Sequence, residues 1–166
     1  MGRRVLTVYE LTFHQKRKRN ASSFAPADLD GEDLLTIFET WVKNLTTAET
    51  HNEGRQTWVS VDDVSLYAPR VLLLDLRVGA YGEAGELVVN TGNPVGDIAD
   101  NQAPTGSNRA LLFVPVTGER AYFLSEESSR GQAGGRIREL FRSYFSHYTD
   151  NVTMVMAAVT ESEVWA

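Results

Sequence analysis

A glycine-rich stretch, residues 128–135, with arginines in it or just after it at positions 130, 136 and 138, is the most distinctive local feature of this chain. It precedes a segment in which apolar residues recur at helical spacing. A glycine-rich loop before a helix can bind an anion, because free N–H groups and the positive end of the helix dipole face the ligand. The alternative is a connection that needs glycine for a tight turn. The residues that we associate with anion or nucleic-acid binding here are Arg130, Gly131, Gly134, Gly135, Arg136 and Arg138.

A second basic group consists of four consecutive residues, Lys16, Arg17, Lys18 and Arg19. Such a run can contact phosphates, because each contact displaces counterions and adds salt-dependent affinity. It can equally be a solvated loop. Both basic groups lie next to predicted helices, which favours a hypothesis in which they form one common surface for a polyanion.

The loop before the second helix partly resembles the acyl-CoA-binding loop of the GNAT acetyltransferase family. That loop has Arg or Gln, two residues, Gly, one residue, and Gly or Ala. Read from Arg130, this chain has Ala133 where the first Gly belongs. Read from Gln132, it has Gly135 in place but Ile137 where a small residue belongs. The resemblance implies an acyl-CoA-dependent transferase as an alternative function.

Other catalytic chemistry finds little support in the sequence. The chain has no cysteine, which excludes thiolate catalysis, disulfides and Cys-type zinc sites. The three histidines are scattered, and no metalloprotease, nucleophile-elbow or Walker A motif occurs. Glu126 and Glu127 could act as a general base at a strand end, or be a solvated strand end. We predict no catalytic residue, no metal and no cofactor, and we favour a protein that is not an enzyme.

Composition is that of a globular protein. The 166 residues suggest one domain, of which 42% are apolar and 23% charged. The net charge of −6 argues against a generic nucleic-acid binder. No signal peptide opens the chain, and no apolar run approaches the ~18 residues of a membrane helix. We expect a cytoplasmic protein without a membrane partner.

Two amphipathic helices must position these residues. The first is predicted over residues 31–46, with Asp30 as its N-cap and Glu32 and Asp33 in its first turn. The second follows the glycine-rich loop and stops at residues 148–151. Their aromatic residues are expected to be core rather than stacking platforms; they are Trp41, Phe141, Tyr144 and Phe145.

The remaining segments predict strands. Alternation indicates strands at residues 4–13, 58–66, 71–78 and 152–160, with a turn at Asp62-Asp63 and a break at Pro69. Residues 86–89 are expected to pair with 71–78. Residues 109–116 and 120–126 predict a hairpin. Turn-forming residues predict a long mobile loop at 91–108.

The predicted fold is a single α+β domain over residues 1–166. Two amphipathic helices cover a mostly antiparallel sheet, in a ferredoxin-like plan with an added hairpin. The apolar end of the chain raises the alternative that more protein follows. The leading functional prediction is a non-enzymatic domain that binds nucleic acid or another polyanion. A protein interaction or assembly domain is the second hypothesis, and the acyl-CoA-dependent transferase is the third.

Overall fold

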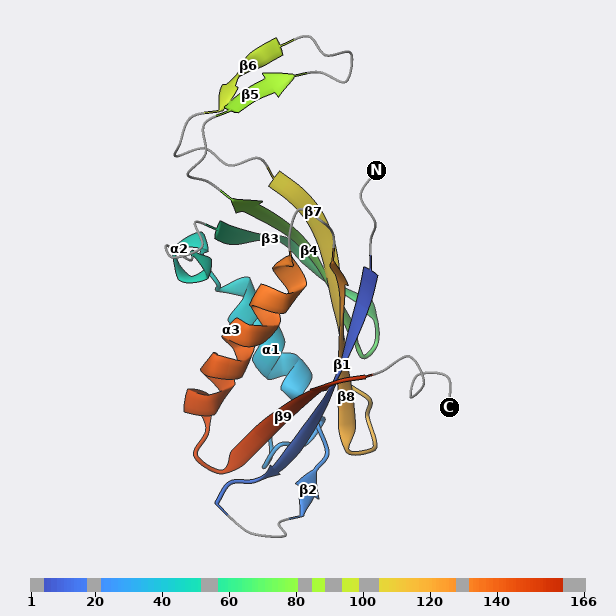
Figure 1. The fold of residues 1–166 in the computed structure, drawn as a ribbon. Helices are drawn as coiled ribbons and strands as arrows, with labels where there is room; N and C mark the ends of the chain where they lie inside the picture. Colours follow the sequence, from blue (N-terminus) through green and yellow to red (C-terminus); the bar gives the residue numbers. More distant parts are fainter. Residues whose placement is uncertain are drawn as a thin grey trace.

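The computed structural model describes residues 5–17, 22–51, 57–80, 85–88, 94–98, 105–127 and 132–159. The fold is of the α+β class, with a curled antiparallel sheet and helices on one side of it (Figure 1). The main sheet has seven strands. They are β1 Val5–Gln15, β2 Ser23–Phe24, β3 Thr57–Ala68, β4 Val71–Ala80, β7 Thr105–Phe113, β8 Arg120–Glu127 and β9 Val152–Ala158.

The order of the main sheet is β3-β4-β7-β8-β1, and every pairing is antiparallel. Strand β1 pairs with β8 and then β2 along one edge, and with β9 along the other. Strands β5 Gly85–Val88 and β6 Pro94–Ile98 form a separate two-stranded sheet beyond the end of β4 (Figure 1).

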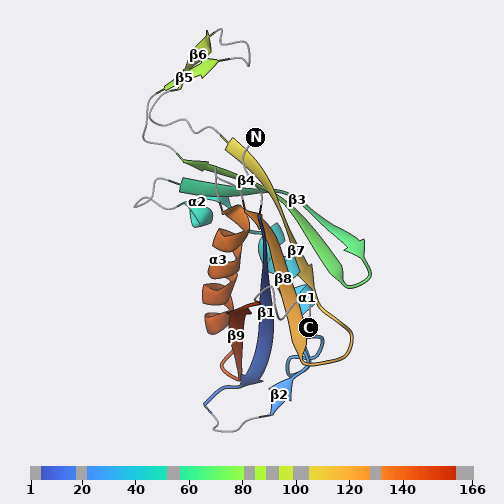
Figure 2. The same ribbon diagram turned by 45° about the vertical axis from the view of Figure 1, so that its right-hand side comes forward.

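Three helices accompany the sheet, namely α1 Leu34–Lys43, α2 Thr47–Thr50 and α3 Ala133–Tyr148. Helices α1 and α3 lie side by side against one face (Figures 1 and 2). Their apolar residues join those of β1, β4, β7 and β8 in one core, in which Leu72, Leu74 and Leu76 of β4 are fully buried. Of the predicted core aromatics, Phe141 and Phe145 are buried, while Tyr144 is 38% exposed.

The predicted start of the first helix was wrong. Helix α1 begins at Leu34, and its N-cap is Asp33 rather than Asp30. The Asp33 carboxylate accepts a hydrogen bond from the Leu35 N–H at 3.0 Å and two from the Arg70 guanidinium at 2.8 and 2.9 Å. Burial acts to raise the pKa of Asp33, but these hydrogen bonds outweigh burial and lower it. Asp30 instead lies in the turn before the helix, with φ at 55°.

The strand predictions need three corrections. Strand β3 does not turn at Asp62-Asp63 but continues through a register shift between Val61 and Asp63. Beside this shift, the Asp62 carboxylate binds Arg77 of β4 across the ladder, at 2.6 Å. Residues 85–88 pair with β6, and β4 pairs with β3 and β7. The predicted loop at 91–108 contains β6 and the start of β7.

Other predictions are confirmed. The hairpin of residues 109–116 and 120–126 corresponds to β7 and β8, which pair directly. The break at Pro69 falls between β3 and β4, and the final strand is β9. Strand β2 and helix α2 lie in segments for which we had predicted neither a strand nor a helix. Helix α2 forms because Thr46 and Glu49 build a reciprocal capping box.

Helix α3 begins inside the predicted glycine-rich loop. Gly134 and Gly135 lie in its first turn and are buried. A Cβ atom at position 134 would lie 2.3 Å from the Cβ of Ser125 on β8, closer than real atoms approach. A Cβ at position 135 would meet its nearest neighbours at 3.7 Å, an ordinary contact. Gly134 therefore lets the backbone of α3 approach the sheet, and Gly135 does not share this role.

We expect Gly134→Ala to lower the free energy of unfolding by about 1–3 kcal/mol, because the added methyl group forces α3 away from β8. Gly135→Ala is the matched control and should raise stability by up to about 1 kcal/mol, through the higher helix propensity of alanine. Urea denaturation of both variants checks this. Equal effects would contradict the close approach at Gly134.

Candidate functional site

The sheet has a second face, opposite the helices. Among the described residues, no helix lies against it (Figure 2). Its side chains alternate along each strand with those of the core, so β8 presents Tyr122, Leu124 and Glu126 there while Ala121, Phe123 and Ser125 are buried. We call this surface the open face.

Apolar side chains cross the middle of the open face in two rows. Strand pairing places Leu73, Leu111, Leu124 and Val8 side by side on four adjacent strands. The next row contains Val71, Phe113 and Tyr122, and the rings of Phe113 and Tyr122 meet edge to face at 6.5 Å. These two rows form a continuous apolar band, because side chains that are neighbours in the ladder lie about 5 Å apart.

Charged pairs border the band at both ends. At one end, Arg109 of β7 donates to Glu126 of β8 at 2.8 Å, and the hydrogen bond and charge of Glu126 raise the pKa of Arg109. At the other end, Arg120 pairs with Glu10 of β1 at 2.6 Å. The open face thus has an apolar centre and a rim that carries both signs of charge.

Two adjoining hollows lie along the band. One has a volume of about 330 Å³ and is bordered by Tyr67, Leu73 and Arg109. The other, of about 750 Å³, is bordered by Val8, Phe113 and Tyr122. Leu6, Leu111 and Leu124 border both hollows. Leu6 is 60% exposed and Tyr67 74% exposed at the margins of the hollows, while Leu73, Leu111 and Leu124 between them are half-buried.

We did not predict the open face, although the sequence contains a signal for it. An antiparallel sheet with one solvated face alternates apolar and polar residues. Strands β4, β7 and β8 instead contain the apolar runs Val-Leu-Leu-Leu, Ala-Leu-Leu-Phe and Ala-Tyr-Phe-Leu. Such runs indicate that both faces are apolar, while two helices are enough to cover only one.

The described part of the basic run at residues 16–19 lies where the end of β1 approaches the end of α3. Lys16 and Arg17 follow the last residue of β1, and the Lys16 ammonium lies 3.4 Å from the Ser146 carbonyl oxygen, near the end of α3. Arg17 adopts a positive φ of 64° in the turn. Lys18 and Arg19 lie outside the described residues.

The described residues of the glycine- and arginine-containing group lie at the start of α3. Arg130 and Gly131 lie outside the described residues. The Arg138 guanidinium lies over the ring of Tyr9, 3.6 Å from its centre, a cation–π contact. The Nε atom of Arg136 and one terminal nitrogen of Arg138 are buried without a hydrogen-bond partner. The N-cap residue Gln132 makes no side-chain cap.

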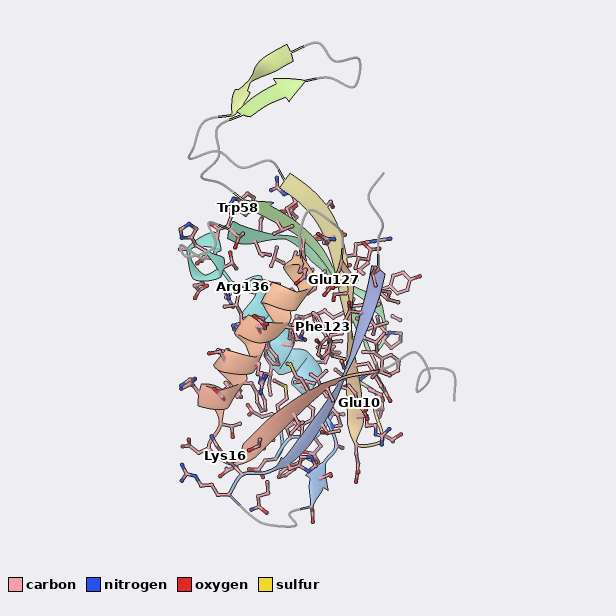
Figure 3. The ribbon with its side chains drawn as sticks, viewed as in Figure 1. Glu10, Lys16, Trp58, Phe123, Glu127 and Arg136 are labelled. Carbon is pink, nitrogen blue, oxygen red and sulfur yellow. The ribbon has the colours of Figure 1, made fainter. Side chains whose placement is uncertain are left out.

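The two basic groups lie at opposite ends of α3, where Figure 3 labels Lys16 and Arg136. Ten residues separate Arg136 from Ser146, the contact of Lys16, which corresponds to about 15 Å along the helix axis. The described residues of the two groups therefore do not form one compact anion site. Only an extended ligand could contact both.

A polar groove of about 370 Å³ runs between α1 and α3, bordered by Thr36, Thr40 and Tyr144. At its end the Tyr148 hydroxyl donates to Glu32 at 2.7 Å. The hydrogen bond to Glu32 and burial raise the pKa of Tyr148. This contact ties the end of α3 to the segment before α1, so we assign it a structural role.

Comparison with protein-family models, with curated proteins and with solved structures gave no match. Within the described segments, no three His, Asp or Glu side chains are grouped as a metal site would require. No helix among the described residues has the length and apolar character needed to cross a membrane. The open face and the start of α3 are thus the two candidate sites.

Because one face of the sheet is open, we expect two neighbouring leucines of β7 to differ in how much their substitution destabilises the protein. Leu112 is 1% exposed beneath the helices, so Leu112→Ala should lower the free energy of unfolding by about 2–5 kcal/mol. Leu111 points to the open face. Leu111→Ala should therefore lower the free energy of unfolding by about 1 kcal/mol or less, which is the contribution of one cross-strand side-chain pair. Urea denaturation at low protein concentration compares the two. Similar losses would show that the open face is covered in solution.

Proposed function

We propose that this chain is a non-enzymatic interaction domain that binds another protein through the open face of its sheet. The observation that carries the proposal is the apolar band of Leu73, Leu111, Leu124 and Val8, bordered by charged pairs. An apolar centre with a polar rim is the usual anatomy of a protein interface. Contiguous exposed apolar patches on soluble proteins mark interaction sites, because leaving them in water is unfavourable.

The open face favours a macromolecular partner over a small substrate. Its hollows are open to solvent, and the side chains around them are mostly apolar or aromatic, or already paired in ion pairs. A small-molecule site instead buries most of its ligand in a concave pocket. The convergent acid–base or nucleophilic groups of a catalytic site are also missing from the residues that border the two hollows.

A photo-crosslinking amino acid at position 111 should give protein adducts, because this position lies at the centre of the band. The chain is irradiated in a lysate of its source cells and analysed by mass spectrometry, and adducts to the chain itself count as well. Position 139 on the exposed side of α3 is the control. Crosslinking at position 111 no stronger than at position 139 would rule out the open face as a binding surface.

Binding of nucleic acid or another polyanion is the second candidate function. It is favoured by the start of α3, where Arg136 and Arg138 have buried nitrogens without partners and the positive end of the helix dipole is near. Lys16 and Arg17 lie at the far end of the helix and would contact an extended polyanion only. The net charge of −6 opposes binding elsewhere on the surface.

We expect the chain to shift single-stranded or double-stranded nucleic acid at low salt in an electrophoretic mobility assay. Arg136→Gln with Arg138→Gln should reduce the slope of log affinity against log salt by about 2, one for each lost phosphate contact. Lys43→Gln, on the exposed end of α1, is the control and should leave the slope unchanged. No shift by the wild-type chain at micromolar concentration would eliminate this function.

A finer description of the fold and a third candidate function complete the proposal. We propose a ferredoxin-like plan, supported by the antiparallel order β9-β1-β8-β7, with α1 after β1, α3 between β8 and β9, and the β3–β4 hairpin added beyond β7. An acyl-CoA-dependent transferase is the third candidate function. Its loop would use Gly134 and Gly135, which pack against Ser125 and Glu127 at the start of α3.

A further inference from the structure

We propose that the partner of the open face is the open face of a second copy of this chain, in a symmetric dimer whose two-fold axis runs along the strands between β7 and β8. This inference rests on the proposed function of the open face and names its occupant. Two sheets packed face to face keep their strands nearly aligned, as in a β-sandwich, and bury both inner faces.

The apolar rows match under this symmetry. A two-fold axis between β7 and β8 brings each β7 side chain over the β8 side chain of the same row in the other copy. Leu111 then meets the second copy's Leu124, and Phe113 meets its Tyr122. On the outer strands of the central row, Leu73 of β4 meets Val8 of β1. The contacts of the central row and of Phe113 with Tyr122 are thus apolar or aromatic on both sides, as a self-complementary interface requires, while at the outer edge of the second row Val71 meets the second copy's Glu10.

The charges match as well. Arg109 and Glu126 share one row of the open face on β7 and β8. The same axis brings Arg109 of each copy over Glu126 of the other, so the two existing ion pairs combine into a ring of four alternating charges. At the opposite rim, the β7–β8 register continued past Phe113 brings Arg120 over Pro115 of the second copy, which carries no charge. Charge complementarity therefore selects this register.

The size of the face sets the expected affinity. Four strands at ~4.8 Å spacing and four rows at ~6.8 Å give roughly 19 by 27 Å, or about 500 Å² in projection. A standard stable interface buries about 800 Å² on each partner. The dimer should accordingly be a reversible one, with a dissociation constant in the micromolar range.

Sedimentation velocity of the full chain from about 1 to 200 µM tests this proposal, because a reversible dimer shifts with concentration. We expect the wild type to move from monomer to dimer. Arg109→Glu and Glu126→Arg each place like charges opposite one another, and each should weaken the dimer at least tenfold. An equimolar mixture of the two variants restores opposite charges at both contacts and should associate more tightly than either variant alone.

Arg120→Glu is the matched control, since it alters an exposed arginine of the same face that has no acid opposite it, and should change the association less than threefold. Circular dichroism verifies that every variant is folded. A wild type that stays monomeric overturns the dimer, while crosslinks from position 111 to other proteins would still support the proposed function. An unchanged dimer in Arg109→Glu, or a mixture that fails to recover, overturns the proposed register.

Discussion

The close approach of α3 to β8 is the contact on which the rest of the structure depends. At Gly134 the helix has no side chain, and the opposing residues Ser125 and Ala110 are small. The helix backbone therefore lies directly on the sheet, and its apolar stripe reaches the core, where Ile137, Phe141 and Phe145 are almost fully buried. Arg138 and Tyr9 then meet beside this contact, and α1 packs on α3 through Phe38 and Phe141.

The single layer of helices covers only one face of the sheet. A sheet of apolar strands must bury both faces, because apolar surface in water costs roughly 25 cal/mol for each Å². Here α1 and α3 lie on the same side (Figure 1), and the opposite rows keep Leu111, Leu124 and Phe113 at the surface. The paired charges at the rim would restrict how the proposed partner docks, because they are already arranged in alternating sign.

The basic residues are distributed differently from the apolar ones. Lys16 is at the end of α3 and Arg138 is at its beginning, because β1 and α3 run alongside each other and the basic run follows β1. Both residues do lie beside a helix, but because they are separated along α3, only an extended ligand could contact both. The open face has the opposite property, since residues from four strands far apart in the sequence form one continuous surface.

The sequence by itself determined the local elements. Helical spacing predicted α1 and α3, alternation predicted β1, β4, β7, β8 and β9, and Pro69 predicted the break before β4. Only the tertiary structure decided which strands pair beyond the β7–β8 hairpin, that Asp33 rather than Asp30 caps α1, and that Gly134 serves packing rather than a loop. The reason is physical: periodicity reports which residues share a face, but Arg70 and Ser125, the neighbours that decide these roles, are 37 and 9 residues away in the chain.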